Sequence, residues 1–230
     1  MRHPWALCIY ALAMGMLEAI VVVYLRRIYY PGGFTFPLVP MEPAMLRAEI
    51  VREAMTLIML WAVAWLAAAT AWTRLLAFLT AFGVWDLSYY LGLKLFLDWP
   101  GSWLTPDILF LIPKVWIGPV LAPALVAMAW TIGGLLLRHS DHRRIGLGWR
   151  TWAVGTLAAG LILASFLLPG ASFDPARPMD PRQAASAFSW PLYLAGLLLG
   201  SAALGRLILI HRGVSRRSSG HSGPPRSARG

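Results

Sequence analysis

Residues 84–94, VWDLSYYLGLK, place several polar side chains inside an apolar stretch of the sequence. Asp86, Tyr90 and Lys94 are spaced i, i+4 and i+8, and Tyr89 lies beside them. In an α-helix this spacing brings the side chains onto one slowly drifting face. A carboxylate, two phenols and an ammonium group can exchange protons, and a carboxylate can also bind a cation. The stretch therefore predicts a polar stripe on an otherwise apolar helix.

The stripe is too long for its two ends to meet. Lys94 lies about 12 Å beyond Asp86 along the helix axis, because each residue adds about 1.5 Å of rise. A direct bond would require the lysine to reach back along its stem. We therefore expect Asp86 and Lys94 to mark the floor and the mouth of one pocket.

Two other apolar stretches carry further charges. Glu18 lies in the first stretch, and Glu49, Arg52 and Glu53 lie in the second. Counting the helical rise places Glu18, Glu53 and Asp86 near one level of the membrane. A charge at the centre of a lipid-facing helix costs roughly 2.5–3.5 kcal/mol, so these groups must face the interior of the bundle. The predicted ligand-binding residues are Glu18, Glu49, Arg52, Glu53, Asp86, Tyr89, Tyr90 and Lys94.

The chemistry of this set has more than one interpretation. Glu53 and Asp86 are the candidates for a catalytic acid or base. Glu18, Glu53 and Asp86 are weak candidates for binding a hard metal ion, because no ExxH pattern accompanies them. In the structural interpretation, Glu18 or Glu53 pairs with Arg52, and Asp86 pairs with Lys94 or a tyrosine hydroxyl. The sequence indicates neither a cofactor nor an oligomeric state.

The elements that must position these residues are membrane spans. The chain has 230 residues, of which 58% are hydrophobic and 13% are charged, and its apolar residues come in long blocks. About 20 apolar residues cross a hydrocarbon core as a helix. Such blocks predict six spans, and the first is too long for a signal peptide. Their approximate ranges are 4–28, 45–70, 75–97, 114–137, 150–168 and 190–210.

The distribution of arginines predicts the orientation of the spans. With both termini in the cytoplasm, the basic segments 138–150 and 211–230 lie inside, as the positive-inside rule requires. The formal net charge of +10 then reflects membrane topology, and we expect the bilayer to be the partner rather than nucleic acid. Arginine outnumbers lysine 18 to 2, which hints at a bacterial inner-membrane protein. A single cysteine, Cys8, excludes an internal disulfide.

Prolines predict a break before the fourth span. Thr105, Pro106 and Asp107 have the sequence of a helix start. A helix from there to residue 137 would overshoot the bilayer, so we expect it to break at Pro113. The segment DILFLI, 107–112, is then predicted to be a short interfacial or re-entrant helix. Pro119 and Pro123 are expected to kink the fourth span.

The sequence thus predicts an all-α, polytopic membrane helix bundle over residues 1–212 and a disordered basic tail over 213–230. Spans one to four would enclose an outward-opening polar pocket, and spans five and six would support it. The preferred function is binding or movement of a small cation, a proton-coupled solute or a lipid headgroup. One alternative is a membrane-embedded enzyme acting on a lipid or another anionic substrate. The other is a structural subunit or assembly factor of a membrane complex.

Overall fold

The computed structural model describes residues 1, 3–32, 39–140, 148–171 and 186–219. These residues form a helical bundle, so the predicted all-α membrane fold is confirmed. Five helices are long and apolar enough to cross a membrane, and a sixth, α4, is shorter. The helices are α1 (Pro4–Tyr29), α2 (Pro43–Ala67), α3 (Ala71–Leu97), α4 (Leu121–Leu136), α6 (Trp149–Gly170) and α8 (Trp190–Ser219).

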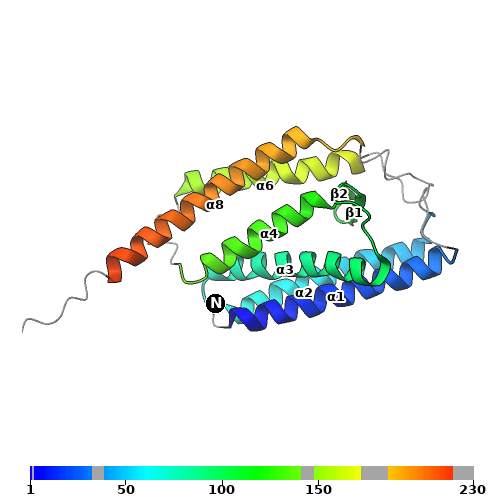
Figure 1. Ribbon diagram of the computed structural model, residues 1–230, viewed down its shortest axis with the longest axis horizontal. Helices are drawn as coiled ribbons and strands as arrows, with labels where there is room; N and C mark the ends of the chain where they lie inside the picture. The colour runs from blue at the N-terminus through cyan, green and yellow to red at the C-terminus, as the bar shows by residue number, and fades with distance from the viewer. Residues whose placement is uncertain (2, 33–38, 141–147, 172–185, 220–230) are drawn as a thin grey trace, which may run out of the picture.

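Helix α3 is the central helix of the bundle. It packs against α1, α2 and α4, and it is the most buried of the five long helices. Helices α6 and α8 pair with each other in a separate layer on the far side of α4 (Figure 1). The pair contacts the rest mainly through β2, a short strand described below, and through α4. Any group that points from α1, α2 or α4 toward α3 therefore lies in the interior.

Small residues allow α3 to approach its neighbours closely. A Cβ atom on Gly15 of α1 would collide with Ser88 and with the backbone carbonyl of Trp85 on α3. A Cβ atom on Gly83 of α3 would collide with α4, at the carbonyl of Ala127 and at Thr131. Close backbone approach is the usual way in which helices pack within a membrane. The tight α1–α3 and α3–α4 contacts fix which side chains face one another across the bundle.

The connection after α3 determines what lies at one end of the bundle. Helix α3 ends at Asp98, which adopts a left-handed conformation with φ of 50°. Strand β1 (Pro106–Phe110) then pairs antiparallel with β2 (Trp116–Pro119). This hairpin lies where α1 and α3 end and α2 begins, and we call this side of the molecule the hairpin end (Figure 1). The opposite side, where α1 starts, is the N-terminal end.

The hairpin corrects the expected secondary structure before the fourth span. A break does precede α4, but the segment DILFLI forms β1 and the following turn instead of a short helix. The physical reason lies in the amino-acid composition of the two strands. Ile108, Phe110, Trp116 and Ile117 favour strands, and they pair across the hairpin. Pro113 lies in the connection, where it removes no ladder hydrogen bond.

The kinks expected in the fourth span also need correction. Pro119 ends β2, and Pro123 lies in the first turn of α4, where the missing N–H would be unsatisfied in any helix. These prolines therefore precede or start α4 and do not kink it. Helix α8 continues to Ser219, past the predicted start of the disordered tail at residue 213. Residues 220–230 lie outside the described residues, as does most of the basic segment 138–150.

The fold offers exposed positions for testing the orientation. Ser102 is exposed at the hairpin end, and Ala69 is exposed in the short α2–α3 connection at the N-terminal end. In a Cys8→Ser background, we predict that a membrane-impermeant maleimide added to intact cells modifies Ser102→Cys. Ala69→Cys should react only after the membrane is permeabilised. The reverse pattern would overturn the predicted orientation.

Candidate functional site

A cavity of about 230 Å³ lies at the hairpin end, between α1, α2, α3 and β1. Seven of the eight predicted ligand-binding residues line it: Glu18, Glu49, Arg52, Glu53, Asp86, Tyr89 and Tyr90. Three helices that are distant in sequence thus bring their polar groups to one place, as their estimated depths predicted. We call this cavity the carboxylate pocket. Ligand binding by these residues stays a prediction.

Lys94 does not line the carboxylate pocket. Its ammonium nitrogen lies 2.6 Å from a carboxylate oxygen of Asp98, and both side chains are exposed. Lys94 therefore lies outside the pocket lining, and its part in ligand binding stays a prediction. Asp98 follows Lys94 by one helical turn, so the two side chains are neighbours on the helix surface. Asp86 and Lys94 do not pair with each other, as their separation along the helix indicated.

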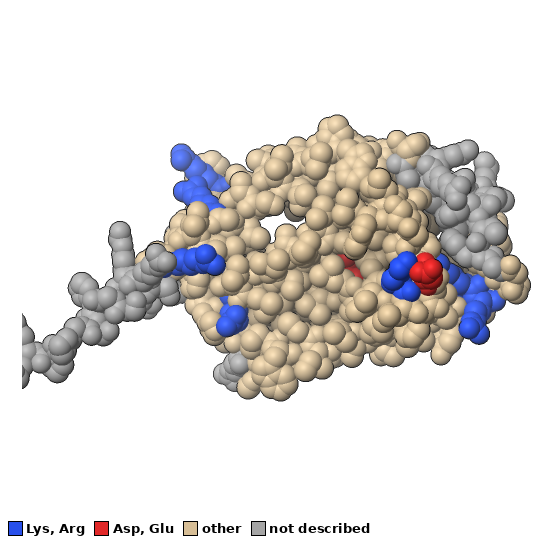
Figure 2. Space-filling view, in the orientation of Figure 1, with Lys and Arg blue, Asp and Glu red and all other residues tan. Residues whose placement is uncertain are grey.

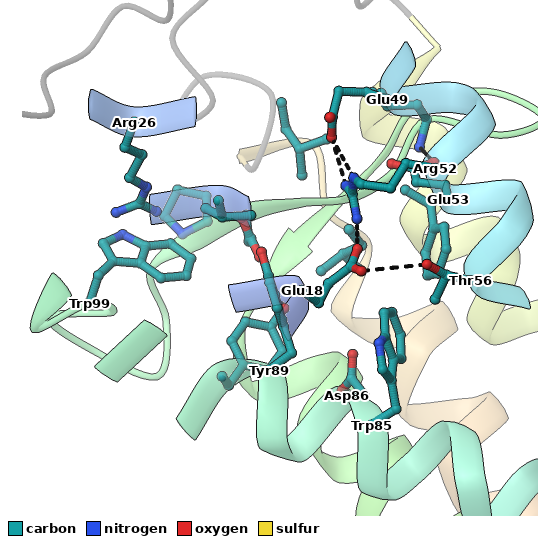
Figure 3. Close-up of a pocket in the computed structure, with 18 of the residues that line it drawn as sticks. Glu18, Arg26, Glu49, Arg52, Glu53, Thr56, Trp85, Asp86, Tyr89 and Trp99 are labelled. Carbon is teal, nitrogen blue, oxygen red and sulfur yellow. Dashed lines mark hydrogen bonds and ion pairs between the residues drawn. The ribbon is translucent and has the colours of Figure 1, made fainter. Parts of the chain in front are cut away.

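Arg52 is the centre of an ion-pair network on one wall of the pocket. Its guanidinium forms an ion pair with Glu18 of α1 and a second ion pair, at 2.7 Å, with Glu49 on its own helix. The hydroxyl group of Thr56 donates a hydrogen bond of 3.4 Å to the carboxylate of Glu18 (Figure 3). The predicted Glu18–Arg52 bridge is thus present. The two carboxylates more than offset the single positive charge of Arg52, so this arginine has little capacity left for an anionic ligand.

Glu53 joins α2 to the hairpin. One of its carboxylate oxygens accepts a hydrogen bond of 2.8 Å from the backbone N–H of Leu111. The residue is buried, with 8% of its surface exposed. A hydrogen bond from a backbone N–H group to an ionised carboxylate is stronger than one between two neutral groups. Glu53 therefore has a structural role that the sequence did not predict, and it holds the hairpin over the pocket.

Asp86 is the pocket carboxylate with a buried oxygen that has no hydrogen-bond partner among the described residues. Only 7% of its surface is exposed, and its Oδ2 atom has no hydrogen-bond partner among the described residues. The predicted pairing with Lys94 or a tyrosine hydroxyl is absent from the described hydrogen bonds. The indole Nε1 of Trp85 is also without a partner there. Figure 3 shows Asp86 and Trp85 on α3, below Glu18 in the view, so that Glu18 lies between Arg52 and Asp86.

A buried, unsatisfied carboxylate is unusual because removing it from water costs free energy that nothing nearby returns. Such a group indicates either a bound proton or a cationic partner that completes it. Asp86 is thus the residue whose surroundings point most directly to a ligand.

Asp107 is a pocket residue that the sequence analysis did not select. The sequence predicts Asp107 to be part of a helix start, but the residue lies on strand β1. It lines the pocket, and its side chain accepts a hydrogen bond of 3.1 Å from the hydroxyl of Tyr90. Burial raises the pKa of Asp107 to about 6, although the Tyr90 hydroxyl and the positive charge of Arg26 act in the opposite direction. Its position depends on the hairpin, which local sequence signals did not reveal.

Aromatic rings and a second arginine form the remaining wall. The guanidinium of Arg26 lies over the ring of Trp99, 4.6 Å from its centroid, and Trp99 stacks against Tyr90. Arg26 and Trp99 both line the pocket. The arginine is thereby held between an aromatic face and the negative charge of Asp107. Both residues could have been noticed as interfacial groups at the ends of the first and third spans.

The arrangement gives no support to a metal ion. Among the described residues, no group of three or more Asp, Glu, His or Cys side chains could hold one. Glu18 is engaged with Arg52, and Glu53 is engaged with the hairpin backbone, so these carboxylates do not converge with Asp86 on one point. What the pocket does offer is a surplus of acid over base. Five carboxylates line it, with two arginines.

Comparison of the chain with family models, with curated proteins and with solved structures finds no match. The geometry of the carboxylate pocket is therefore the basis for proposing a function.

The Arg52 network generates the first prediction from the site. Arg52→Gln should lower the free energy of unfolding by about 3 kcal/mol, because Glu18 and Glu49 lose the charge between them. Thermal unfolding in detergent would measure this. Adding Glu18→Gln should recover much of the loss. The matched control is Arg47→Gln, which changes an exposed arginine on the same helix and should have little effect. Failure of the double variant to recover stability would contradict the network's role.

The raised pKa of Asp107 generates a prediction about pH. Because burial favours its neutral form, Asp107 contributes stability that is fully present below about pH 4 and is lost as the pH rises through about 6. The stability of the wild type should therefore fall relative to Asp107→Asn between pH 4 and 7. Asp98→Asn serves as a control of opposite sign, since Lys94 lowers the pKa of Asp98. Parallel curves for wild type and Asp107→Asn would contradict this.

Proposed function

We propose that this multi-pass membrane protein binds a small cationic group, of the ammonium type, in the carboxylate pocket. The observation that carries the proposal is Asp86, a buried carboxylate with an unpartnered oxygen at the pocket. A bound ammonium group would supply both the missing hydrogen bond and the missing positive charge. The excess of carboxylates over arginines favours a cation over an anion.

The aromatic lining supports the same choice. Trp85, Tyr89 and Trp99 line the pocket beside the carboxylates. The face of an aromatic ring carries negative electrostatic potential, so it attracts ammonium groups when water is excluded. Arg26 already uses the face of Trp99 in this way. Of the ligands considered from the sequence, a phosphate-bearing headgroup is the least favoured, because both arginines are already engaged.

We further propose that the pocket opens to the outside of a bacterial inner membrane, with both termini in the cytoplasm. Arg138 and Arg150 flank the basic segment at the N-terminal end, where Arg74 also lies against the face of Trp65. An excess of arginine in the connecting segments is typical of the cytoplasmic side, and aromatic residues are typical of either interface. The hairpin end would then face outward.

Binding is favoured over movement across the membrane. Between Asp86 and the N-terminal end of the bundle, the adjoining cavity is lined almost wholly by apolar residues. A hydrophilic cation would meet few polar partners among the residues that line that route. The pocket therefore has the character of a one-sided site.

One observation favours a second candidate function, a membrane-embedded acid–base enzyme. Asp107 has a pKa of about 6 and donor and charge partners in Tyr90 and Arg26. A carboxyl group that titrates near neutral pH can both take and return a proton. In this interpretation Asp107 joins Glu53 and Asp86 as a candidate catalytic group, and the bound cation is its substrate.

The test uses methylammonium as the probe. We predict a saturable change in tryptophan fluorescence when detergent-solubilised protein is titrated with methylammonium chloride at constant ionic strength. Asp86→Asn should weaken binding at least tenfold, while its melting temperature stays equal or rises, since an amide is cheaper to bury than an unpaired charge. Asp98→Asn, which neutralises an exposed aspartate outside the pocket, should bind like the wild type.

Two outcomes would contradict the proposal. Equal affinity in wild type and Asp86→Asn would show that the carboxylate does not bind the cation. A large loss of stability in Asp86→Asn, recovered by a second neutralisation at another pocket charge, would favour the structural interpretation of the charges.

A further inference from the structure

The described residues also enclose a larger cavity, of about 490 Å³, between α3, α4, α6 and α8. Its lining consists mainly of aliphatic and aromatic side chains with several alanines and glycines. The volume lies within the usual range of small-molecule sites, whereas that of the carboxylate pocket lies below it. We call it the apolar cavity. Figure 2 shows an opening in the surface between α4 and the α6–α8 pair, on the side where this cavity lies.

The apolar cavity is closed at both of its ends by side-chain packing. At the hairpin end, Phe166 of α6 stacks on Trp116 of β2. At the N-terminal end, Leu204 of α8 packs against Leu137 and tightly against Gly133 of α4. Between these two contacts α6 and α8 stand away from α3. The space is therefore a hollow between two layers of the bundle, bounded at both ends and open at the surface between α4 and the α6–α8 pair (Figure 2).

The two cavities share a wall. Asp86, Leu109 and Phe110 line both of them. The unpartnered carboxylate thus lies where a polar chamber meets an apolar one. A small hydrophilic cation would use only the first chamber, and a hydrocarbon would use only the second. A molecule with a charged head and an apolar chain could use both.

We propose that the ligand is a single-chain cationic amphiphile, with its ammonium head on Asp86 in the carboxylate pocket and its hydrocarbon chain in the apolar cavity. This inference rests on the proposed function and specifies its ligand class. Charge complementarity selects the head, because carboxylates outnumber arginines around it. The chain follows from the lining, since a large apolar chamber with few polar groups favours hydrocarbon over water.

Gly155 offers a way to fill the apolar cavity without touching the carboxylate pocket. It lies on α6, lines the apolar cavity, and has no atom within 4 Å of the position of an added Cβ. Gly155→Leu should therefore place its side chain in free space. Gly160 is the matched control, because it lies on the same helix with the same open surroundings and does not line the cavity.

The experiment compares methylammonium with octylammonium, below its micelle concentration, on the full chain in nanodiscs of one lipid composition. We expect Gly155→Leu to weaken octylammonium binding at least tenfold and to leave methylammonium binding unchanged. Gly160→Leu should bind both probes like the wild type. Because partitioning into the bilayer is the same for every variant, the comparison isolates the cavity. Melting curves of each variant would establish that it is folded.

The experiment distinguishes failure of the amphiphile inference from failure of the proposed cation site. If methylammonium binds and octylammonium binds equally well to wild type and Gly155→Leu, the chain lies in the bilayer, and the amphiphile inference is overturned while the cation site stands. If neither probe binds the wild type, the proposed function itself is overturned. If filling the cavity weakens both probes equally, the two chambers do not hold separate parts of one ligand, and the inference again fails.

Discussion

The structure depends on the cost of placing charge inside a membrane helix bundle. A carboxylate in hydrocarbon must be paired, protonated or turned toward other polar groups. This constraint orients α1, α2 and α3, because Glu18, Arg52 and Asp86 can satisfy it only by facing the space between these helices. Arg52 forms ion pairs with two carboxylates, Glu18 and Glu49, and so lowers the cost of burying both. The apolar faces of the same helices are left to pack tightly or to face lipid.

The hairpin solves the remaining part of this problem at one end of the bundle. It brings a backbone N–H group to Glu53 and the Asp107 carboxyl group to Tyr90. Strands within reach of the membrane are tolerated when their polar groups are covered by protein. The hairpin is covered in this way, since β2 packs against α6 and β1 forms a wall of the carboxylate pocket. One short element therefore both covers the pocket and contacts the α6–α8 layer.

The distribution of partners separates the paired charges of the pocket from Asp86. Glu18, Glu49, Arg52 and Glu53 have partners within the protein, so stability alone accounts for them. Asp86 has an oxygen without such a partner, although it lies on the most buried helix. A bundle under selection only for stability would gain from an asparagine or an apolar residue there. Asp86 also lines both the carboxylate pocket and the apolar cavity, and the proposed cationic ligand would offset the cost of its burial.

The sequence by itself determined the membrane class, most span boundaries and the placing of Glu18, Glu53 and Asp86 near one level of the bundle. Hydropathy and helical rise are local quantities, so these features follow from counting along the chain. Only the tertiary structure decided that the segment after α3 is a hairpin, that Asp107 and Trp99 join the pocket, and that Lys94 turns away to Asp98. It also decided which charges pair and that an apolar cavity adjoins Asp86. Those features depend on contacts between residues far apart in the chain, so no local sequence pattern predicts them.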